Sequence, residues 1–335
     1  VAGAAKYFEE KAPWADEYKK TWTTVPVAAS VNVLFGVGHA GPSVPLGINL
    51  PNSQKIREEH GSKSVFLNNV MEGAKSATGS AATEEFAHPE ERDACLRYRK
   101  ETGVLMVALH EVVGHGSGKA SSNLKRDPSS YLKETYSTLE EARAELVALY
   151  HIFDPILVDM GLISSKAAPI SALNSYLQHG LVQLRRVKNG DVIEDDHMRA
   201  SHLIVEYLKN EGDCVEVVDI DGKRFQRVSD PKKAHETLGE LLAHIQKIKS
   251  EGDLKAARAL VDKYAVRFDP VLRDQVVVRA KKAGIPDFVA FHMPALKQKM
   301  DSAGNVVDVL LDYSTDFDTM MLRFDMGDNM KAEAK

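Results

Sequence analysis

The sequence predicts a mostly α-helical protein with small β segments. From about 54 to 210, apolar residues recur at spacings of three and four, with Gly or Pro interruptions typical of helix ends. Between 231 and 264, two amphipathic helical stretches flank Gly252, which we expect to form a turn. Alternating valines within 25–35 and the valine-rich run 306–311 favour short strands instead.

The remaining elements follow in chain order. Residues 1–21 are polar and permit helix, whereas the Gly, Pro and His cluster at 36–47 predicts loops. A hairpin is expected near 215–228, because apolar residues flank the dipeptide Asp221-Gly222, a strong two-residue turn signal. Residues 286–312 are expected to form strands, and the tail at 330–335 to be frayed.

A chain of 335 residues is long enough for two domains of ~150 residues each. We expect a helical region at 1–24 and 54–280, which includes the hairpin near 215–228. We expect strand and loop segments at 25–53 and 281–335.

Composition narrows the possible partners and location. A net charge of -5 and a pI near 6.2 argue against nucleic-acid binding, which usually requires a basic domain. No run reaches the ~18 apolar residues of a membrane span, and the first residues do not resemble a signal peptide. Two distant cysteines, Cys95 and Cys214, are too few for a disulfide framework, so we expect a reducing compartment.

A candidate metal motif ends the apolar run at 104–115. His110 and His115 lie five residues apart, with Glu111 after the first histidine. In the common zinc-peptidase motif the histidines are four apart and share one helical face. Five residues of an ideal helix would turn the two rings about 140° apart. Either this is no metal site, or the helix carries a π-bulge, which Gly114 would make less costly.

A third ligand could come from the acidic run that begins about 25 residues later. Glu140, Glu141 and Glu145 lie on a helical segment, with Glu141 and Glu145 on one face. One carboxylate could bind zinc while its neighbours accept hydrogen bonds from the ligand histidines. The residues alone leave open which one binds, and an Ala-rich helix with three Glu is also typical of a solvated face.

With zinc bound, Glu111 would act as general base toward a water molecule activated by the metal. A single His-Glu-x-x-x-His also occurs by chance, so the interpretation depends on the two motifs together.

Together the two motifs resemble those of the dipeptidyl peptidase III family of zinc exopeptidases. Its His-Glu-x-x-Gly-His motif matches 110–115, and its Glu-Glu-x-Arg-Ala-Glu motif matches 140–145. The resemblance implies one zinc ion per chain, bound by His110, His115 and Glu141. It implies that Glu140 and Glu145 accept hydrogen bonds from the ligand histidines.

Three further segments resemble parts of the family's substrate site. The resemblance implies that Asn49 and Asn52 bind the peptide substrate, that His197 stabilises the transition state and that Arg279 is a basic residue of the cleft. Each also has a simpler explanation: a turn around a proline, a helix cap and a surface arginine. The family has a basic residue one turn after this histidine, whereas here the position is Ser201.

The resemblance implies a cytosolic zinc metallopeptidase that releases dipeptides from the N-terminus of short peptides. Family members are much longer and have two lobes, one helical with the zinc and one built on a β-barrel. This chain resembles the part after a large N-terminal section, which we therefore expect as a partner within a longer polypeptide. The strand-like segments resemble pieces of the second lobe.

Two alternatives stay open. Another zinc exopeptidase, such as an aminopeptidase, would release single residues. A non-catalytic peptide-binding fragment would keep the metal for structure, but structural zinc sites use four protein ligands and only three candidates are apparent.

Overall fold

The computed structural model describes residues 1–22, 24–34, 45–78, 80–187, 190–287 and 291–325. The chain divides into two compact units, each described by itself. Unit 1 comprises Val1–Ser30, Gly47–Phe66 and Thr78–Asp287, and unit 2 comprises Val31–Leu46, Leu67–Ala77 and Phe288–Lys335.

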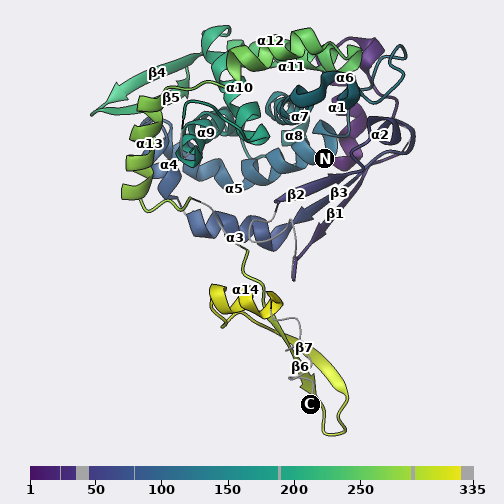
Figure 1. Ribbon diagram of the computed structural model, residues 1–335, viewed down its shortest axis with the longest axis vertical. Helices are drawn as coiled ribbons and strands as arrows, with labels where there is room; N and C mark the ends of the chain where they lie inside the picture. Colours follow the sequence, from purple (N-terminus) through teal and green to yellow (C-terminus); the bar gives the residue numbers. More distant parts are fainter. Residues whose placement is uncertain (23, 35–44, 79, 188–189, 288–290, 326–335) are drawn as a thin grey trace. The chain divides into compact units, whose positions relative to one another are not determined.

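Unit 1 is dominated by helices (Figure 1). Its α-helices are α1 (Ala5–Lys11), α2 (Gln54–His60), α4 (Ala81–Phe86), α5 (Arg92–Ala108), α6 (Pro128–Leu132), α7 (Tyr136–His151), α8 (Ile156–Asp159), α9 (Ala168–Gln183), α10 (Asp196–Asn210), α11 (Pro231–Glu251), α12 (Leu254–Tyr264) and α13 (Pro270–Lys282). Short 3-10 turns are η1 (Ala2–Ala4), η2 (Asp16–Tyr18), η5 (Lys133–Thr135) and η6 (Leu184–Arg186), while η4 (Leu109–Gly114) is a π-helix.

Helix α7 forms the centre of unit 1. It packs against α10, α11 and η4, and Figure 1 shows it surrounded by other helices. Leu139, Leu146 and Leu149 are fully or almost fully buried, and they belong to one continuous apolar core. A helix that is buried on all sides is expected to be apolar on all sides, so the charged residues on α7 need specific partners.

Side-chain caps set several helix ends. Asp195 accepts a hydrogen bond from the Met198 backbone at the start of α10, and Asp253 accepts one from Ala256 at the start of α12. Between α11 and α12, Gly252 adopts a left-handed conformation with φ 68°, as expected for a helix C-terminus. The turn predicted at this glycine is confirmed.

Two small sheets belong to unit 1. Strands β1 (Val27–Val31), β3 (Lys63–Leu67) and β2 (Gly47–Leu50) lie in that order, and β2 and β3 are antiparallel. Strands β4 (Val215–Ile220) and β5 (Lys223–Val228) form a hairpin. Its turn residues Asp221 and Gly222 have φ of 51° and 72°, the conformation that an Asp-Gly turn favours.

Strand β3 interrupts the region that we expected to be helical from 54 onward. Its residues have no strong strand pattern of their own, and hydrogen bonding to β2 stabilises the extended conformation. The same pairing brings residues 47–50 into unit 1, although we had grouped 25–53 with the strand and loop segments.

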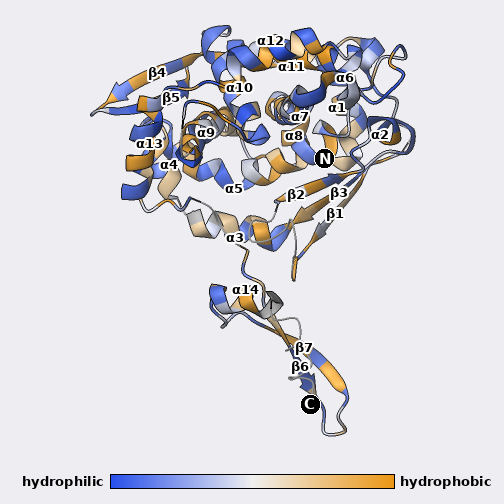
Figure 2. Cartoon of the chain, in the orientation of Figure 1, coloured by the Kyte–Doolittle hydropathy of each residue, from blue (hydrophilic) through white to orange (hydrophobic). Residues whose placement is uncertain are grey.

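Unit 2 contains α3 (Asn68–Thr78), β6 (Ala295–Met300), β7 (Val306–Asp312) and α14 (Phe317–Asp325). Strands β6 and β7 form an antiparallel hairpin, and Figure 2 shows apolar residues along it. The Asn69 side chain both donates to and accepts from the Val33 backbone, at 2.7 and 2.9 Å. Most of the loops expected at 36–47, and the tail at 330–335, lie outside the described residues.

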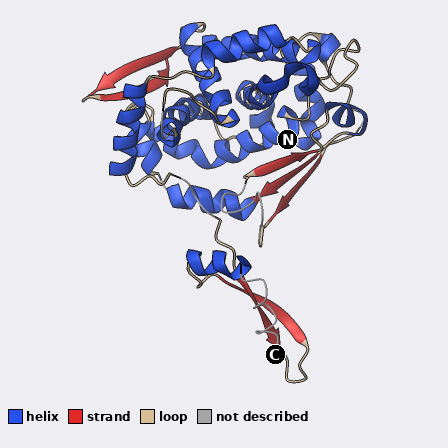
Figure 3. Cartoon of the chain, viewed as in Figure 1, coloured by secondary structure: helices blue, strands red, loops and turns tan. Residues whose placement is uncertain are grey.

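The predicted fold class is confirmed, because helices predominate and the strands form only small sheets (Figure 3). Within the described residues, no helix has the length and apolar character needed to cross a membrane.

Candidate metal centre

The π-helix η4 brings the two motif histidines together. The His115 backbone N–H donates to the His110 carbonyl at 3.0 Å, a bond that spans five residues instead of four. This wider turn compensates for the five-residue spacing, and the two ring centroids lie 4.8 Å apart. The bulge predicted near Gly114 is confirmed, and the alternative of two diverging histidines is excluded by the geometry.

Gly114 lets η4 approach α7 closely. A Cβ atom at this position would lie 2.8 Å from Ala144 Cα and 2.9 Å from the Ala144 carbonyl oxygen. Real Cβ atoms do not approach backbone atoms so closely, so any larger residue would push the two helices apart. The glycine therefore permits the contact between the histidine motif and the acidic motif.

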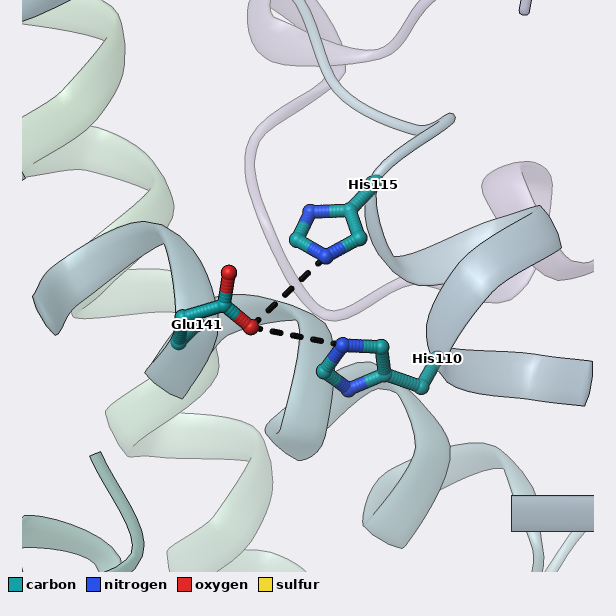
Figure 4. A group of neighbouring side chains, drawn as sticks. All are labelled: His110, His115 and Glu141. Atoms are coloured by element: carbon teal, nitrogen blue, oxygen red, sulfur yellow. Dashed lines mark ion pairs between the residues drawn. The ribbon is translucent and has the colours of Figure 1, made fainter. Parts of the chain in front are cut away.

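His110, His115 and Glu141 meet between η4 and α7 (Figure 4). Their possible ligand atoms all lie within 4.8 Å of one another. Glu141 Oε2 is 3.4 Å from His110 Nε2 and 3.7 Å from His115 Nε2. The same oxygen is buried and has no hydrogen-bond partner among the described residues, so its lone pairs are free for a cation. Two imidazoles and one carboxylate match the ligand set of catalytic zinc sites.

Electrostatics within the cluster favour a cation. Burial alone would raise the pKa of Glu141, but the histidines around it hold this pKa at about 2. Burial lowers the pKa of His115 to about 4, so its ring is neutral at pH 7. Burial alone would lower the pKa of His110, but Glu141 and Glu145 raise this pKa to about 9. Without metal a proton on His110 balances the carboxylates, and a bound cation could replace it.

The opposite edge of each ring faces a second carboxylate. His115 Nδ1 lies 3.1 Å from Glu140 Oε1 in hydrogen-bond geometry, while His110 Nδ1 lies 3.9 Å from Glu145 Oε1. Carboxylates in this position fix the orientation of ligand histidines. Burial raises the pKa of Glu145, whereas Glu140 is kept ionised by neighbouring cations.

Glu140 has partners that the motifs did not predict. Arg143 donates to both of its oxygens, at 2.8 and 3.0 Å, and Arg57 of α2 donates to Oε1 at 3.3 Å. Arg57 also donates to the carbonyls of Pro51 and His115. The sequence could have predicted the Arg143–Glu140 pair, because an arginine three residues after a Glu on a helix can form an ion pair with it. Arg57 has no such spacing from Glu140.

Glu111 lies beside the cluster. It is only 9% exposed, and burial raises the pKa of its carboxyl. Its charge interacts with His110, Glu141 and His197. Strand β2 packs closely against it, since a Cβ on Gly47 would lie 2.9 Å from Glu111 Cγ.

Asn49 and Asn52 lie on and just after β2. The buried Asn49 amide donates to the Glu111 carbonyl at 2.9 Å and to Ser62 and Ser64, while its Oδ1 has no partner among the described residues. Asn52 is exposed and accepts a hydrogen bond from Arg57. Asn49 is thus tied directly to the segment that carries Glu111.

His197 reaches the cluster from the first turn of α10. Its Nδ1 lies 3.3 Å from Glu141 Oε2, although the side chain is 68% exposed. Capping of this helix is performed by Asp195, so His197 is free to face the cluster.

Among the predicted site residues, Arg279 has no contact with the His110, His115 and Glu141 cluster in the described structure. It is 7% exposed, lies between Phe86 and Phe225, and donates to Glu85 and to backbone carbonyls. Because its guanidinium is enclosed by protein partners, we correct the expectation of a cleft-lining residue: Arg279 ties α13 to α4 and β5.

Comparisons with known proteins find similar chains. Dipeptidyl peptidase 3 of Mus musculus is 29% identical over 325 aligned residues, which cover 83% of this chain and 43% of the mouse protein. The Rattus norvegicus protein of the same name is 28% identical with the same coverage. The chain thus spans less than half the length of these two relatives.

A solved structure of DPP III from Caldithrix abyssi has the same fold over 84% of this chain, with a TM-score of 0.65 and 24% identity, and is covered over 51% of its own length. The family model described as "Peptidase family M49" matches residues 1–129 and 122–302. Because these matches cover most of the sequence, the chain belongs to peptidase family M49, as the resemblance to dipeptidyl peptidase III indicated.

Proposed function

We propose that this chain is the zinc-binding part of a metallopeptidase that removes dipeptides from the N-terminus of short peptides. One observation carries the proposal: His110, His115 and Glu141 converge within 4.8 Å, with the buried carboxylate of Glu111 beside them. Membership of a peptidase family and relatives named dipeptidyl peptidase 3 support the reaction class.

The residues that would hold zinc are His110, His115 and Glu141, with Glu140 and Glu145 behind the two rings. A zinc ion held there would supply Lewis acidity and would make the attacking water easier to deprotonate. Glu111 then accepts the proton of the attacking water on its carboxylate and passes it to the amine that leaves. His197, exposed and 3.3 Å from Glu141, can donate to the oxygen that gains negative charge.

Asn49 and Asn52 would bind the peptide backbone beside β2. Asn49 Oδ1 is a buried acceptor without a partner among the described residues, and Asn52 is exposed. The relatives are longer than this chain, and we propose that the additional sequence completes the substrate cleft and selects dipeptides.

Metal analysis combined with product identification on a tetrapeptide tests the proposal. We expect one zinc per chain and release of dipeptides. Release of single residues would favour an aminopeptidase. Zinc without any hydrolysis, also after addition of the sequence that relatives carry beyond this chain, would favour a peptide-binding fragment.

Glu111→Gln should keep zinc and reduce hydrolysis by about 10²- to 10⁴-fold, the usual contribution of a general base. Glu236→Gln is a matched control, because Glu236 is exposed and contacts only Lys232 at 3.8 Å within the described ion pairs. Full activity of Glu111→Gln would end the general-base assignment.

A further inference from the structure

Lys249 is a buried cation behind the metal centre. It lies in the last turns of α11, its side chain is 4% exposed, and its Nζ lies 2.7 Å from Glu140 Oε2. Burial, reinforced by Arg143, lowers the pKa of Lys249 to about 7. Removing an ammonium group from water is costly, and a buried ion pair is a weak source of stability.

The two carboxylate oxygens of Glu140 contact different sets of partners. Oε1 faces His115 Nδ1 at 3.1 Å and also accepts from Arg57 and Arg143. Oε2 faces Arg143 Nε at 3.0 Å and Lys249 Nζ at 2.7 Å. Lys249 therefore holds the oxygen that does not contact the histidine.

Neither charge balance nor hydrogen bonding requires this lysine. Arg57 and Arg143 already compensate the single charge of Glu140. Within the described part of the chain, Glu140 is the anion that forms an ion pair with the Lys249 ammonium, at 2.7 Å. The contact does link α11 to α7, the helix that carries the acidic motif.

We propose that Lys249 is a positioning residue of the metal centre. Together with Arg143, which donates to both oxygens, Lys249 fixes the rotation of the Glu140 carboxylate by attracting Oε2. This keeps Oε1 on His115 Nδ1 and the Nε2 edge of the ring toward Glu141. The inference rests on the proposed function only in assuming that a metal binds His110, His115 and Glu141.

Zinc affinity, measured by competition with a chromogenic chelator, tests this role. Lys249→Met should weaken zinc binding by about tenfold. This is the lower end of the 10- to 100-fold range for residues that orient a metal ligand without binding the metal. The visible spectrum of the cobalt-loaded protein should also change, because His115 is no longer held in one orientation. Lys247→Met is the matched control: Lys247 lies two residues away on the exposed side of α11, and neither measurement should change.

A double-mutant cycle separates positioning from general stabilisation. If Lys249 acts through Glu140, adding Lys249→Met to Glu140→Gln should change zinc affinity by less than about twofold. Lys249→Gln takes the place of Lys249→Met in both measurements if the methionine variant does not fold.

The outcomes are distinct. Unchanged affinity in a folded Lys249 variant, or an undiminished effect in the Glu140→Gln background, would overturn the inference alone. A wild-type chain that binds no zinc would overturn the proposed function and the inference together.

Discussion

The candidate metal centre of unit 1 and the β6–β7 hairpin of unit 2 reverse the usual distribution of polar and apolar residues. Around η4 and α7, charged side chains are buried: Arg57, Glu140, Arg143 and Lys249 are each at most 6% exposed. Along β6 and β7, apolar side chains are exposed, with Leu296, Val307 and Leu310 between 49% and 57%. Figure 2 shows the apolar character of this hairpin.

The comparison shows that partners, more than residue type, decide burial here. Each of these four buried charges has an opposite charge within 3.3 Å, which offsets part of its desolvation. The hairpin strands contact each other through backbone hydrogen bonds, but a two-stranded hairpin has too little surface to bury its own side chains.

The largest expected effect is loss of the metal. Glu141→Ala removes one of three ligands and should weaken zinc binding by roughly 10³-fold or more, beyond the 10- to 100-fold typical of supporting residues. Metal content after dialysis measures this. Asp308→Ala in the exposed hairpin should keep full zinc content. Retention of zinc by Glu141→Ala would show that another carboxylate is the ligand.

A Leu→Ala substitution should lower the free energy of unfolding by different amounts in the two regions. Leu149→Ala in α7 leaves a cavity in a fully buried site and should lower the free energy of unfolding by about 2–5 kcal/mol. Leu310→Ala in β7, 49% exposed, should change it by less than about 0.5 kcal/mol. Urea denaturation of the metal-free protein measures both. Equal costs would mean that the hairpin is buried in solution.

Replacing two different glycines with alanine should change the stability of the protein in opposite directions. Gly114→Ala forces the new Cβ against Ala144 and should destabilise the protein by about 1–3 kcal/mol while weakening zinc binding. Gly73→Ala in α3 of unit 2 meets nothing within 4 Å and should be neutral or stabilising by about 0.5–1 kcal/mol. Thermal unfolding compares the two. A stable Gly114→Ala protein with wild-type zinc affinity would contradict the close approach of η4 and α7.

The last prediction concerns the dependence of zinc affinity on pH. In the metal-free protein the pKa of His110 is about 9, so at pH 7 this ring must lose a proton to bind zinc. His115, with a pKa of about 4, is already neutral. Affinity should therefore rise about tenfold per pH unit from pH 6 to 8 and level off above pH 9.

Calorimetry in two buffers of different ionisation enthalpy counts the protons released. One proton per zinc at pH 7 is expected from this site, and release of none would contradict the protonated state of His110.

Much of the fold could be predicted from local pattern. The amphipathic stretches around Gly252 and the Asp221-Gly222 turn depend on residues close in sequence, so propensity and spacing were sufficient. The spacing of His110 and His115 left the bulge near Gly114 as one of two alternatives. Strand β3 was missed because its extended conformation depends on pairing with β2. Arg279 was assigned to a cleft because its segment resembles part of the family's substrate site, whereas Phe86 and Phe225 enclose it.

The sequence by itself determined the two candidate histidines, the acidic motif that could supply the third ligand and the helix distortion that a shared metal would require, since these lie within two short segments. Only the tertiary structure decided which partners hold Glu140, because Arg57 and Lys249 come from α2 and α11, far away in the chain. It also decided that Asn49 bonds to the Glu111 carbonyl, 62 positions away. Such contacts depend on how helices pack around α7, and no local pattern encodes that packing.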